Sequence, residues 1–469
     1  MTFSSDYNQN NNHLKEALRM GESFDLICKD TVIGGRNACF FFVDGLTKDE
    51  TMQKLLSGFY TIQETDMPDN AVDFSIQQLP HIEADLTSDV PKTVTSILSG
   101  MTAILIDGYD TAICLDVRTY PSRSVEQPDK EKVLRGSKDG FVETVVFNTA
   151  LIRRRIRDPR LTMEMLSVGS VSHTDVVLCY MENNVDAVLL ETIRRKLTQL
   201  KVHALSMNQS SLAECLYQRK WYNPFPKYKY TERPDTAAAS ILEGSLVILV
   251  DNSPSAIILP TSLFGIMEEA DDYYLPPITG TYLRLTRFLI STVTFFITPT
   301  FLLLTMYPQW IPRWLSFIQL QESTNVPLMF QFLILEIAID GLRLAAVNTP
   351  SMLSTPLSII AGLALGEYAV SSGWFNPEAM LYMAFVALSN YTQPSYELGY
   401  ALKFFRMFTV LFTGLFGIFG LLGGTALLLL ALLTNRTIDG RRRYLYPLIP
   451  FDWKILKRQL LRLRRDENS

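Results

Sequence analysis

Three ionisable residues interrupt one long apolar stretch of the sequence, residues 326–347. Glu336, Asp340 and Arg343 are spaced four and then three positions apart, which places all three on one face of a helix. Carboxylates inside a membrane segment mark ion pathways or are paired with cations, because lipid does not hydrate them. The stretch therefore predicts a helix whose charged face lies against protein or a water-filled pathway.

A second candidate for ion chemistry follows at residues 353–370. Gly362 and Gly366 permit close helix packing, and the carboxylate of Glu367 can attract cations. Apolar residues one turn apart in the same stretch could close a pore by dewetting. We predict that this helix lines a pore, although an ordinary packed helix could carry the same residues. The pore or gating candidates are Ile359, Leu363, Glu367, Glu336, Asp340 and Arg343.

The sequence offers no recognisable catalytic centre. The apolar part of the chain has no histidine, and the chain has neither an HExxH motif nor a nucleophile elbow. Residues 135–140 (RGSKDG) lack the pattern of a phosphate-binding loop. Because these motifs are absent, we expect no enzyme, no catalytic residue, no metal site and no cofactor. The alternative is an intramembrane hydrolase that uses Glu336 and Asp340, for which no known motif speaks.

Apolar stretches after residue 280 predict an α-helical polytopic membrane domain over residues 281–435. Each crossing requires about 20 apolar residues. Basic residues before the first stretch and after the last place both ends in the cytoplasm, so the number of crossings is even. Four crossings satisfy this rule, and a fifth with a further partial one is the competing count. The predicted crossings are 288–307, 326–347, 353–370 and 407–435, with 376–391 as a re-entrant or additional span.

The last predicted crossing, residues 407–435, contains no charged side chain. Its glycines recur at every third position, which predicts a groove that lets another helix approach closely. The basic tail after it, residues 436–469, includes an alternation of apolar and basic residues at 454–465. This alternation predicts an amphipathic helix on an anionic inner leaflet, so membrane lipids are an expected partner. The helix-packing candidates are Gly362, Gly366, Gly414, Gly417, Gly420 and Gly423.

Residues 1–280 are acidic, although the whole chain carries a net charge of only −5. This sign argues against nucleic acid as a partner. Residues 1–22 are polar and lack the apolar core of a signal peptide, so we expect a disordered segment and a cytoplasmic N-terminal region. The five cysteines all lie in this region without a CxxC pair, which predicts reduced thiols.

One pattern occurs twice in the acidic region. Residues 96–116 (SILSGMTAILIDGYDTAICLD) and 240–260 (SILEGSLVILVDNSPSAIILP) each describe a helix end closed by Gly, a strand, a short turn and a return strand. Such self-similarity predicts a duplication. We expect a cytoplasmic α/β region of two related subdomains, residues 23–130 and 131–280. Convergence of two hairpins on one apolar pattern is the alternative.

A run of arginines follows a predicted helix of the second subdomain. Cations are favoured at a helix C-terminus, and such a run is commonly solvated. In a ring of copies it could instead contact an acidic neighbour. The oligomer contact candidates are Arg153, Arg154 and Arg155.

Several motifs occur in the order typical of one known family. They are VLRG (133–136), DGFVE (139–143), NTALIRRRI (148–156), NPFP (223–226), YTERPD (230–235), LE (335–336) and PSYELG (394–399). With them the chain resembles the GerA family of spore germination proteins, A-subunit type, and most closely its stage V sporulation protein AF branch. The resemblance covers nearly the whole chain after residue 23. Gly136-Ser137 stands where nutrient-receptor A subunits have Gly-Pro.

The resemblance implies a protein of the inner membrane of a bacterial endospore with a cytoplasmic N-terminal region. It further implies a homo-oligomer, a pentamer, that acts as a gated cation channel during exit from dormancy. Other germination membrane proteins are further expected partners. Nutrient sensing belongs to a separate B subunit, whose ten-helix pattern this chain lacks. The alternative function is a non-conducting scaffold or regulatory subunit of a germination complex.

Overall fold

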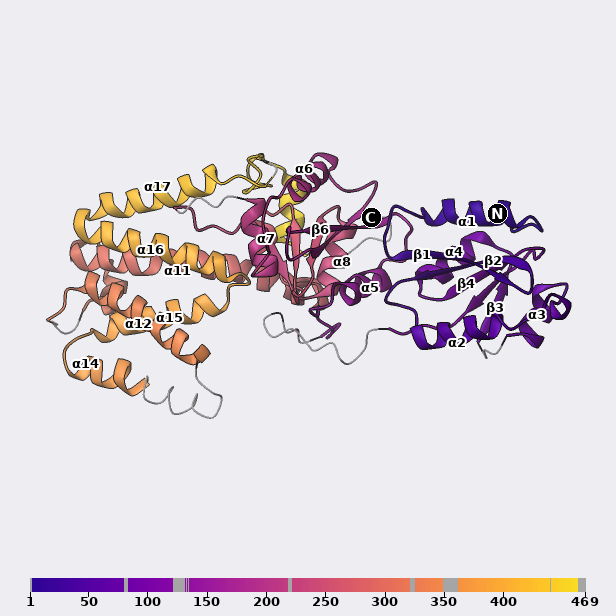
Figure 1. Cartoon of the computed structure of the whole chain (residues 1–469). Helices are drawn as coiled ribbons and strands as arrows, with labels where there is room; N and C mark the ends of the chain where they lie inside the picture. The colour runs from indigo at the N-terminus through magenta and orange to yellow at the C-terminus, as the bar shows by residue number, and fades with distance from the viewer. Residues whose placement is uncertain are drawn as a thin grey trace. The chain divides into compact units, whose positions relative to one another are not determined.

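The computed structural model describes residues 2–79, 83–120, 131, 133, 135–217, 222–320, 325–348, 362–438 and 440–462, with only the backbone of 363–365. The chain divides into two compact units (Figure 1). Unit 1 comprises Met1–Gln218 and Tyr228–Pro260, and unit 2 comprises Arg219–Lys227 and Thr261–Ser469. A short segment before Tyr228 thus belongs to unit 2, whereas the chain on both sides of it belongs to unit 1.

The first half of unit 1 is an antiparallel sheet with helices on both faces. Successive strand residues point to opposite faces. Phe41 therefore packs in a core with α1 and α4, whereas Phe40 packs in a second core with α2 and α3. The sheet order is β1-β2-β4-β5-β3. The elements are α1 (Tyr7–Leu18), β1 (Leu26–Ile33), β2 (Arg36–Val43), α2 (Asp49–Phe59), α3 (Ala71–Gln77), β3 (Ala84–Thr87), α4 (Val90–Leu98), β4 (Thr102–Ile106) and β5 (Ala112–Leu115).

The second half of unit 1 repeats this topology. Its antiparallel order, β6-β7-β9-β10-β8, matches the first sheet position by position. The repeated segment is α4-β4-β5 in one half and α8-β9-β10 in the other, so the predicted pair of related α/β subdomains is confirmed. The elements are α5 (Val145–Arg155), β6 (Leu161–Val168), β7 (Thr174–Met181), α6 (Ala187–Thr198), α7 (Asn208–Leu216), β8 (Lys229–Thr231), α8 (Pro234–Leu242), β9 (Leu246–Val250) and β10 (Ala256–Leu259).

The N-terminal segment is helical, and the prediction of disorder over residues 1–22 is wrong. Asp6 caps α1, because its carboxylate accepts the backbone N–H groups of Asn8 and Gln9. Leu14 and Leu18 are fully buried in the core of the first sheet. Two leucines on one face thus order a helix whose remaining residues are mostly polar.

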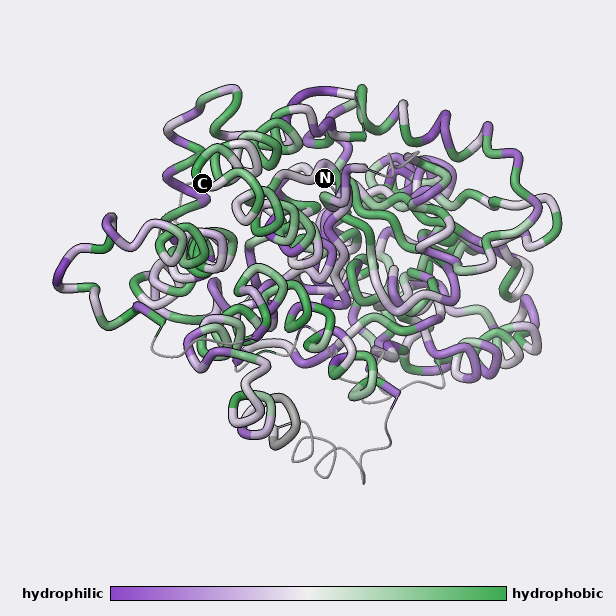
Figure 2. Tube along the Cα trace, turned by 90° about the vertical axis from the view of Figure 1, so that its left-hand side faces the viewer, coloured by the Kyte–Doolittle hydropathy of each residue, from purple (hydrophilic) through white to green (hydrophobic). Residues whose placement is uncertain are grey.

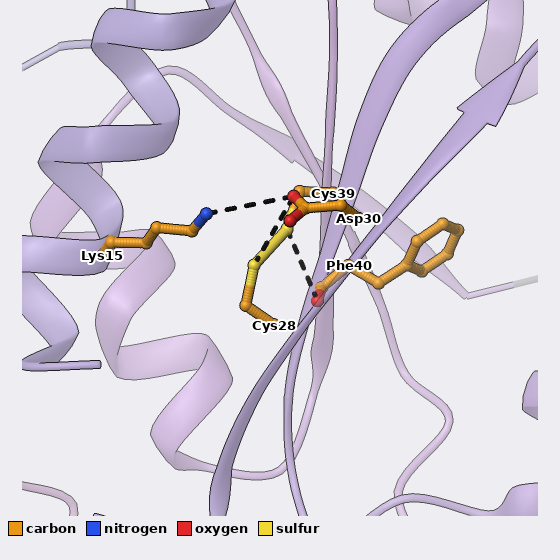
Figure 3. The surroundings of a disulfide bond; sticks show 5 residues. All are labelled: Lys15, Cys28, Asp30, Cys39 and Phe40. Atoms are coloured by element: carbon orange, nitrogen blue, oxygen red, sulfur yellow. Dashed lines mark hydrogen bonds and ion pairs between the residues drawn. A yellow bond between two sulfur atoms is a disulfide. The ribbon is translucent and has the colours of Figure 1, made fainter. Parts of the chain in front are cut away.

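Cys28 and Cys39 face each other across the β1–β2 hairpin and form a disulfide (Figure 3). The register pairs Cys28 with Phe41 and Asp30 with Cys39, so the two cysteines are diagonal neighbours on one face. The expectation of reduced thiols is wrong for this pair, because hairpin register brings the residues together. Asp30 and the two sulfurs are the one group of potential metal ligands in the described residues. The disulfide occupies both sulfurs.

Unit 2 is helical. Within the described ranges, α11 and α16 are long and apolar enough to cross a membrane, and α17 is apolar but shorter. Figure 2 shows long apolar stretches interrupted by polar turns. The helices are α9 (Leu263–Ile266), α10 (Asp271–Tyr274), α11 (Pro277–Met306), α12 (Leu328–Asn348), η4 (Leu363–Tyr368), α14 (Ala369–Ser371), α15 (Pro377–Tyr391), α16 (Tyr396–Phe416), α17 (Ile418–Thr434) and α18 (Trp453–Leu460).

Contacts near the helix ends establish how α11, α12 and α16 run. Tyr307 lies beside Gly417, and each follows the last residue of its helix, so α11 and α16 are parallel. The α12 helix runs the opposite way. Its early residue Phe332 packs on Phe301 late in α11, whereas its late residue Arg343 lies over the ring of a tyrosine that begins α16.

The α15 helix runs in the same direction as α12. Asn376, just before α15, donates its backbone N–H to Oε1 of Gln331 at 2.9 Å, near the start of α12. Tyr391, which ends α15, lies 5.7 Å from the guanidinium of Arg343, near the end of α12. Asn348, which ends α12, and Asn376, just before α15, therefore lie at opposite ends of these two helices. The interval between them in the sequence contains the predicted crossing 353–370.

The predicted single crossing 407–435 is wrong, because the chain reverses at Gly417. This residue has φ 62° and ψ −132°, a conformation open to glycine. After the turn, Gly420 packs against the backbone of Phe412, and Gly424 packs against Thr409. The result is a hairpin in which α16 and α17 lie side by side (Figure 1).

Residues 222–227, which belong to unit 2, contact both arms of the α16–α17 hairpin. Phe225 stacks on Phe405 of α16, with ring centroids 5.5 Å apart. The Nζ atom of Lys227 donates to the backbone carbonyl of Arg436 at 2.9 Å and to the side chain of Asn435. A cation at this position suits the C-terminal end of α17.

Candidate functional site

Four charged side chains from α12 and α16 meet inside unit 2. The Nη2 atom of Arg406 lies 2.6 Å from Oε1 of Glu336, and its Nε donates to the same oxygen at 2.8 Å. The Nζ atom of Lys403 lies 3.2 Å from Oε2 of Glu336 and 2.6 Å from Oδ2 of Asp340. Two carboxylates face two cations, so the group is formally neutral.

Three members of this group are deeply buried, and Asp340 is partly exposed. Glu336 and Lys403 are 3% exposed, and Arg406 is fully buried. Arg406 also donates to the backbone carbonyl of Thr294 in α11, at 3.4 Å. A buried ion pair adds little net stability, but removing one partner costs about 3–5 kcal/mol because the other charge is left uncompensated. The charges join α12 to α16, and Arg406 also contacts the backbone of α11.

Arg343 extends the charged face by one turn toward the end of α12. Its guanidinium lies 4.4 Å from the ring centroid of Tyr396 and 5.5 Å from that of Tyr400. Such cation–π contacts suit a guanidinium that is removed from bulk water. An open pocket lies beside these rings. Its lining is Asp340, Arg343, Asn390, Tyr396, Gly399, Tyr400 and Lys403.

Three predicted gating candidates lie in or beside this group. Glu336 and Asp340 are paired with cations of the same chain, whereas a pore wall would leave them to water. Arg343 lies among tyrosine rings. The arrangement can hold helices together and screen charge.

The sequence interpretation missed Lys403 and Arg406 as members of the site. Both residues precede the predicted crossing 407–435. In the structure they lie inside α16, seven and ten positions after its first residue, Tyr396. The available signal was charge complementarity. Two carboxylates in one apolar helix require two cations in another, and these two residues lie one turn apart.

The second candidate element is only partly described. Glu367 is exposed and lies in η4, a π-helical turn. A Cβ atom added at Gly362 or Gly366 would meet nothing within 4 Å, so neither glycine packs against another described helix of this chain. Ile359 and the side chain of Leu363 lie outside the described residues.

The glycines of residues 414–423 have different environments. Gly414 packs against Met329 of α12, and Gly420 packs inside the hairpin. Gly417 makes the turn itself. Gly423 is exposed and has nothing within 4 Å of an added Cβ. The stripe is therefore not one continuous groove, because the chain reverses within it.

The arginines at the end of α5 also differ from one another. Arg153 is fully buried, and its Nε donates to Oδ2 of Asp25 at 2.7 Å. Arg153 thus joins the two halves of unit 1, and its side chain is not available to a neighbouring copy. Arg155 pairs with Asp139 at 2.5 Å. Arg154 is exposed, with its guanidinium 4.5 Å from the ring centroid of Tyr120, and its contact with a neighbour stays a prediction.

Residues 12–468 match the family described as Bacillus/Clostridium GerA spore germination protein. The chain is 37% identical to stage V sporulation protein AF of Bacillus subtilis (strain 168), over 97% of this chain and 92% of that protein. It is 30% identical to spore germination protein A1 of the same strain, over 80% of this chain and 82% of that protein.

A solved structure is also similar to part of the chain. It is the N-terminal domain of the A subunit of the Bacillus megaterium spore germinant receptor GerK3. The identity is 24% and the TM-score is 0.41, over 55% of this chain and 96% of that chain. The family match spans both units, and the sequence motifs and the relatives agree with it. The chain therefore belongs to the GerA family of spore germination proteins.

Proposed function

We propose that this chain is a multi-pass membrane subunit of the spore germination apparatus, and that copies of it assemble into a gated cation channel. The observation that carries the proposal is the segment around Glu367, whose glycines meet no other helix among the described residues. The carboxylate of Glu367 is exposed. In a bilayer such a carboxylate requires water or a partner, and such glycines favour another helix.

Six crossings account for the helix directions in unit 2. The α11 and α16 helices run one way, and α12, α15 and α17 run the other. The crossing predicted at 353–370 would lie between α12 and α15 and would complete an even count of six. The arginines after α17 favour a cytoplasmic C-terminal end, and an even count then favours a cytoplasmic N-terminal region. The membrane is the inner membrane of the spore, as the relatives' germination role suggests.

A ring of copies would bring the Glu367 segments together around one axis. A pentamer is the size that the family resemblance implies. Glu367 would then attract cations toward the opening, and the apolar residues one and two turns earlier would form the gate. The π-helical turn at Leu363–Tyr368 fits a gate, because such turns occur frequently at functional sites.

The test is purification in detergent, mass measurement of the assembly, and single-channel recording after reconstitution. Glu367→Gln is expected to reduce cation conductance without preventing assembly. Glu50→Gln, which removes an exposed carboxylate of α2, is the matched control and should conduct normally. A strictly monomeric protein without conductance would contradict the proposal.

A cysteine scan tests the pore assignment separately. Cysteines placed at 359, 363 and 367, in a Cys215→Ser background, should react with water-borne thiol reagents. The reaction at 359 and 363 should be faster in the open state. If all three stay unreactive in both states, this segment does not line a pore.

A second function, a non-conducting scaffold or regulatory subunit of a germination complex, is favoured by one observation. Glu336 lies in ion pairs with Lys403 and Arg406 inside unit 2, as expected for a dry helix bundle. The two functions differ in one measurable respect. A scaffold would assemble with other germination membrane proteins and show no conductance of its own.

A further inference from the structure

Between α17 and α18, residues 448–453 form a turn with an apolar surface, called the tip below. Leu448, Ile449, Phe451 and Trp453 are 44%, 47%, 67% and 64% exposed. The rings of Phe451 and Trp453 are stacked with centroids 6.4 Å apart. Four large apolar side chains that gather at one turn and face outward are unusual for a surface in contact with water alone.

Hydrogen bonds of Asp452 connect the tip to α18 and to Tyr446. Asp452 caps α18 by accepting the backbone N–H of Ile455 at 3.1 Å, and Tyr446 donates to the same carboxylate at 3.3 Å. Leu456 is buried within unit 2. The sequence predicts that the apolar face of this helix contacts lipid, whereas in the structure its central residue, Leu456, is buried against protein.

The end of α18 is fastened to the base of α11. The Nη1 atom of Arg284 donates to the backbone carbonyl of Gln459 at 3.0 Å, and Nε of Arg284 donates to buried Asp272 at 3.1 Å. The backbone N–H of Arg462 donates to the hydroxyl of Thr281 at 3.0 Å. These contacts leave the tip side of α18 uncovered.

The attachment also places the end of α18 relative to the apolar part of α11. Arg284 lies four residues before position 288, where the apolar part of α11 begins. At 1.5 Å per residue this is about 6 Å along the helix. If α11 crosses the bilayer, as the proposed function requires, the attached end of α18 lies at the level of the lipid headgroups. Tryptophan and other aromatic rings favour this interfacial zone.

Exposed cations precede and follow the apolar tip in the sequence. They are Arg442, Arg443, Lys454 and Lys457, and all four side chains are exposed. The combination of an aromatic tip with cations on both sides matches a surface of anionic phospholipid, because the rings enter the interface while the cations contact phosphate. Neither a neutral bilayer nor water would satisfy both features.

We infer that the tip formed by Leu448, Ile449, Phe451 and Trp453, with its flanking cations, is a docking surface for anionic phospholipid headgroups on the cytoplasmic face. The inference rests on the proposed membrane topology. Because the end of α18 is hydrogen-bonded to the first turns of α11, lipid bound at the tip also helps to hold the first crossing in place. The composition of the inner leaflet then influences how firmly α11 is held.

The test uses the tryptophan of the tip as a probe of depth. The other four tryptophans, Trp221, Trp310, Trp314 and Trp374, are replaced by Phe in the full chain, which is reconstituted in nanodiscs. The discs contain phosphatidylcholine with or without phosphatidylglycerol, brominated near the glycerol end of the acyl chains. Trp453 fluorescence should be quenched, and more strongly when phosphatidylglycerol is present.

Charge removal tests the headgroup contact. Lys454→Gln with Lys457→Gln should weaken docking of the tip about 30-fold, equal to about 2 kcal/mol, and remove the phosphatidylglycerol dependence of quenching. Lys54→Gln with Lys92→Gln, exposed lysines of α2 and α4, is the matched control and should change nothing.

A second single-tryptophan protein, retaining only Trp374, separates the two possible failures. If Trp374 is quenched and Trp453 is not, the helical unit is in the bilayer and the inferred docking surface is wrong. If neither is quenched, the proposed membrane topology fails as well. Quenching of Trp453 that is equal in both lipids would also overturn the anionic-lipid assignment.

Discussion

The guanidinium of Arg406 and the carboxylate of Glu336 lie 2.6 Å apart in the interior of unit 2, although they are separated by 70 residues of sequence. Lys403 completes the balance by contacting both Glu336 and Asp340. The helices α12 and α16 can thus bring charges into an apolar bundle, because each carboxylate meets a cation of the same chain.

Removing Arg406 should destabilise unit 2. Arg406→Met leaves Glu336 with Lys403 as its remaining cation and should cost about 3–5 kcal/mol. Thermal unfolding in detergent, followed by intrinsic fluorescence, measures the effect. Arg343→Met, which removes cation–π contacts, should cost less, about 0.5–2 kcal/mol. The double variant Glu336→Leu with Arg406→Met should recover most of the loss. If it is no better than the single variant, the pairing energy is not the cause.

Arg153 and its neighbour Arg154 should respond differently to substitution. Arg153→Met leaves Asp25 buried without its guanidinium, and unfolding free energy should fall by about 3–5 kcal/mol. Arg154→Met removes an exposed contact with Tyr120 and should cost about 1 kcal/mol or less. Chemical denaturation of the full chain in detergent compares them. Equal losses would mean that burial does not set the cost.

The fold predicts opposite responses at two glycines of α17. Gly420→Ala places a methyl group against the backbone of Phe412 and should force the hairpin apart, with a lower unfolding temperature. Gly423→Ala adds a methyl group in open space and should be neutral or stabilising by up to about 1 kcal/mol. Equal tolerance at both positions would argue against the hairpin and for a continuous helix.

The three free cysteines should differ in reactivity. Burial raises the pKa of the Cys114 thiol to about 11 and also raises the pKa of the Cys179 thiol. Because the thiolate is the reactive form, both should resist alkylation at pH 8 in the folded protein, whereas exposed Cys215 is labelled. Mass spectrometry after labelling with and without denaturant gives the result. Labelling of Cys114 at the rate of Cys215 would contradict its burial.

The same shift affects stability. The folded Cys114 holds its proton at a pH where the unfolded chain, with an ordinary thiol pKa of 9.0, has lost it. Folding stability contributed by this group is therefore full below pH 9 and falls as pH rises toward 11. Cys114→Ala should flatten the alkaline part of the stability curve measured by denaturation.

Local patterns predicted much of this fold. The helix-and-hairpin repeat was visible because strand alternation, a closing glycine and a short turn all lie within about twenty residues of chain. Helices at 328–348 and 377–391 lie close to the predicted stretches for the same reason. Glu336 and Asp340 were recognised as unusual because charge inside an apolar helix is costly wherever the helix packs.

The sequence by itself determined the acidic and basic regions, the duplicated α/β topology, the apolar helices and the family. Each of these depends on residues near one another in the chain or on motifs in order. Only the tertiary structure decided that Glu336 meets Arg406, that Arg153 is internal, that Leu14 orders the N-terminal helix, and that the chain reverses at Gly417. Those outcomes depend on which distant surfaces meet, because burial and pairing energies arise between elements and not within them.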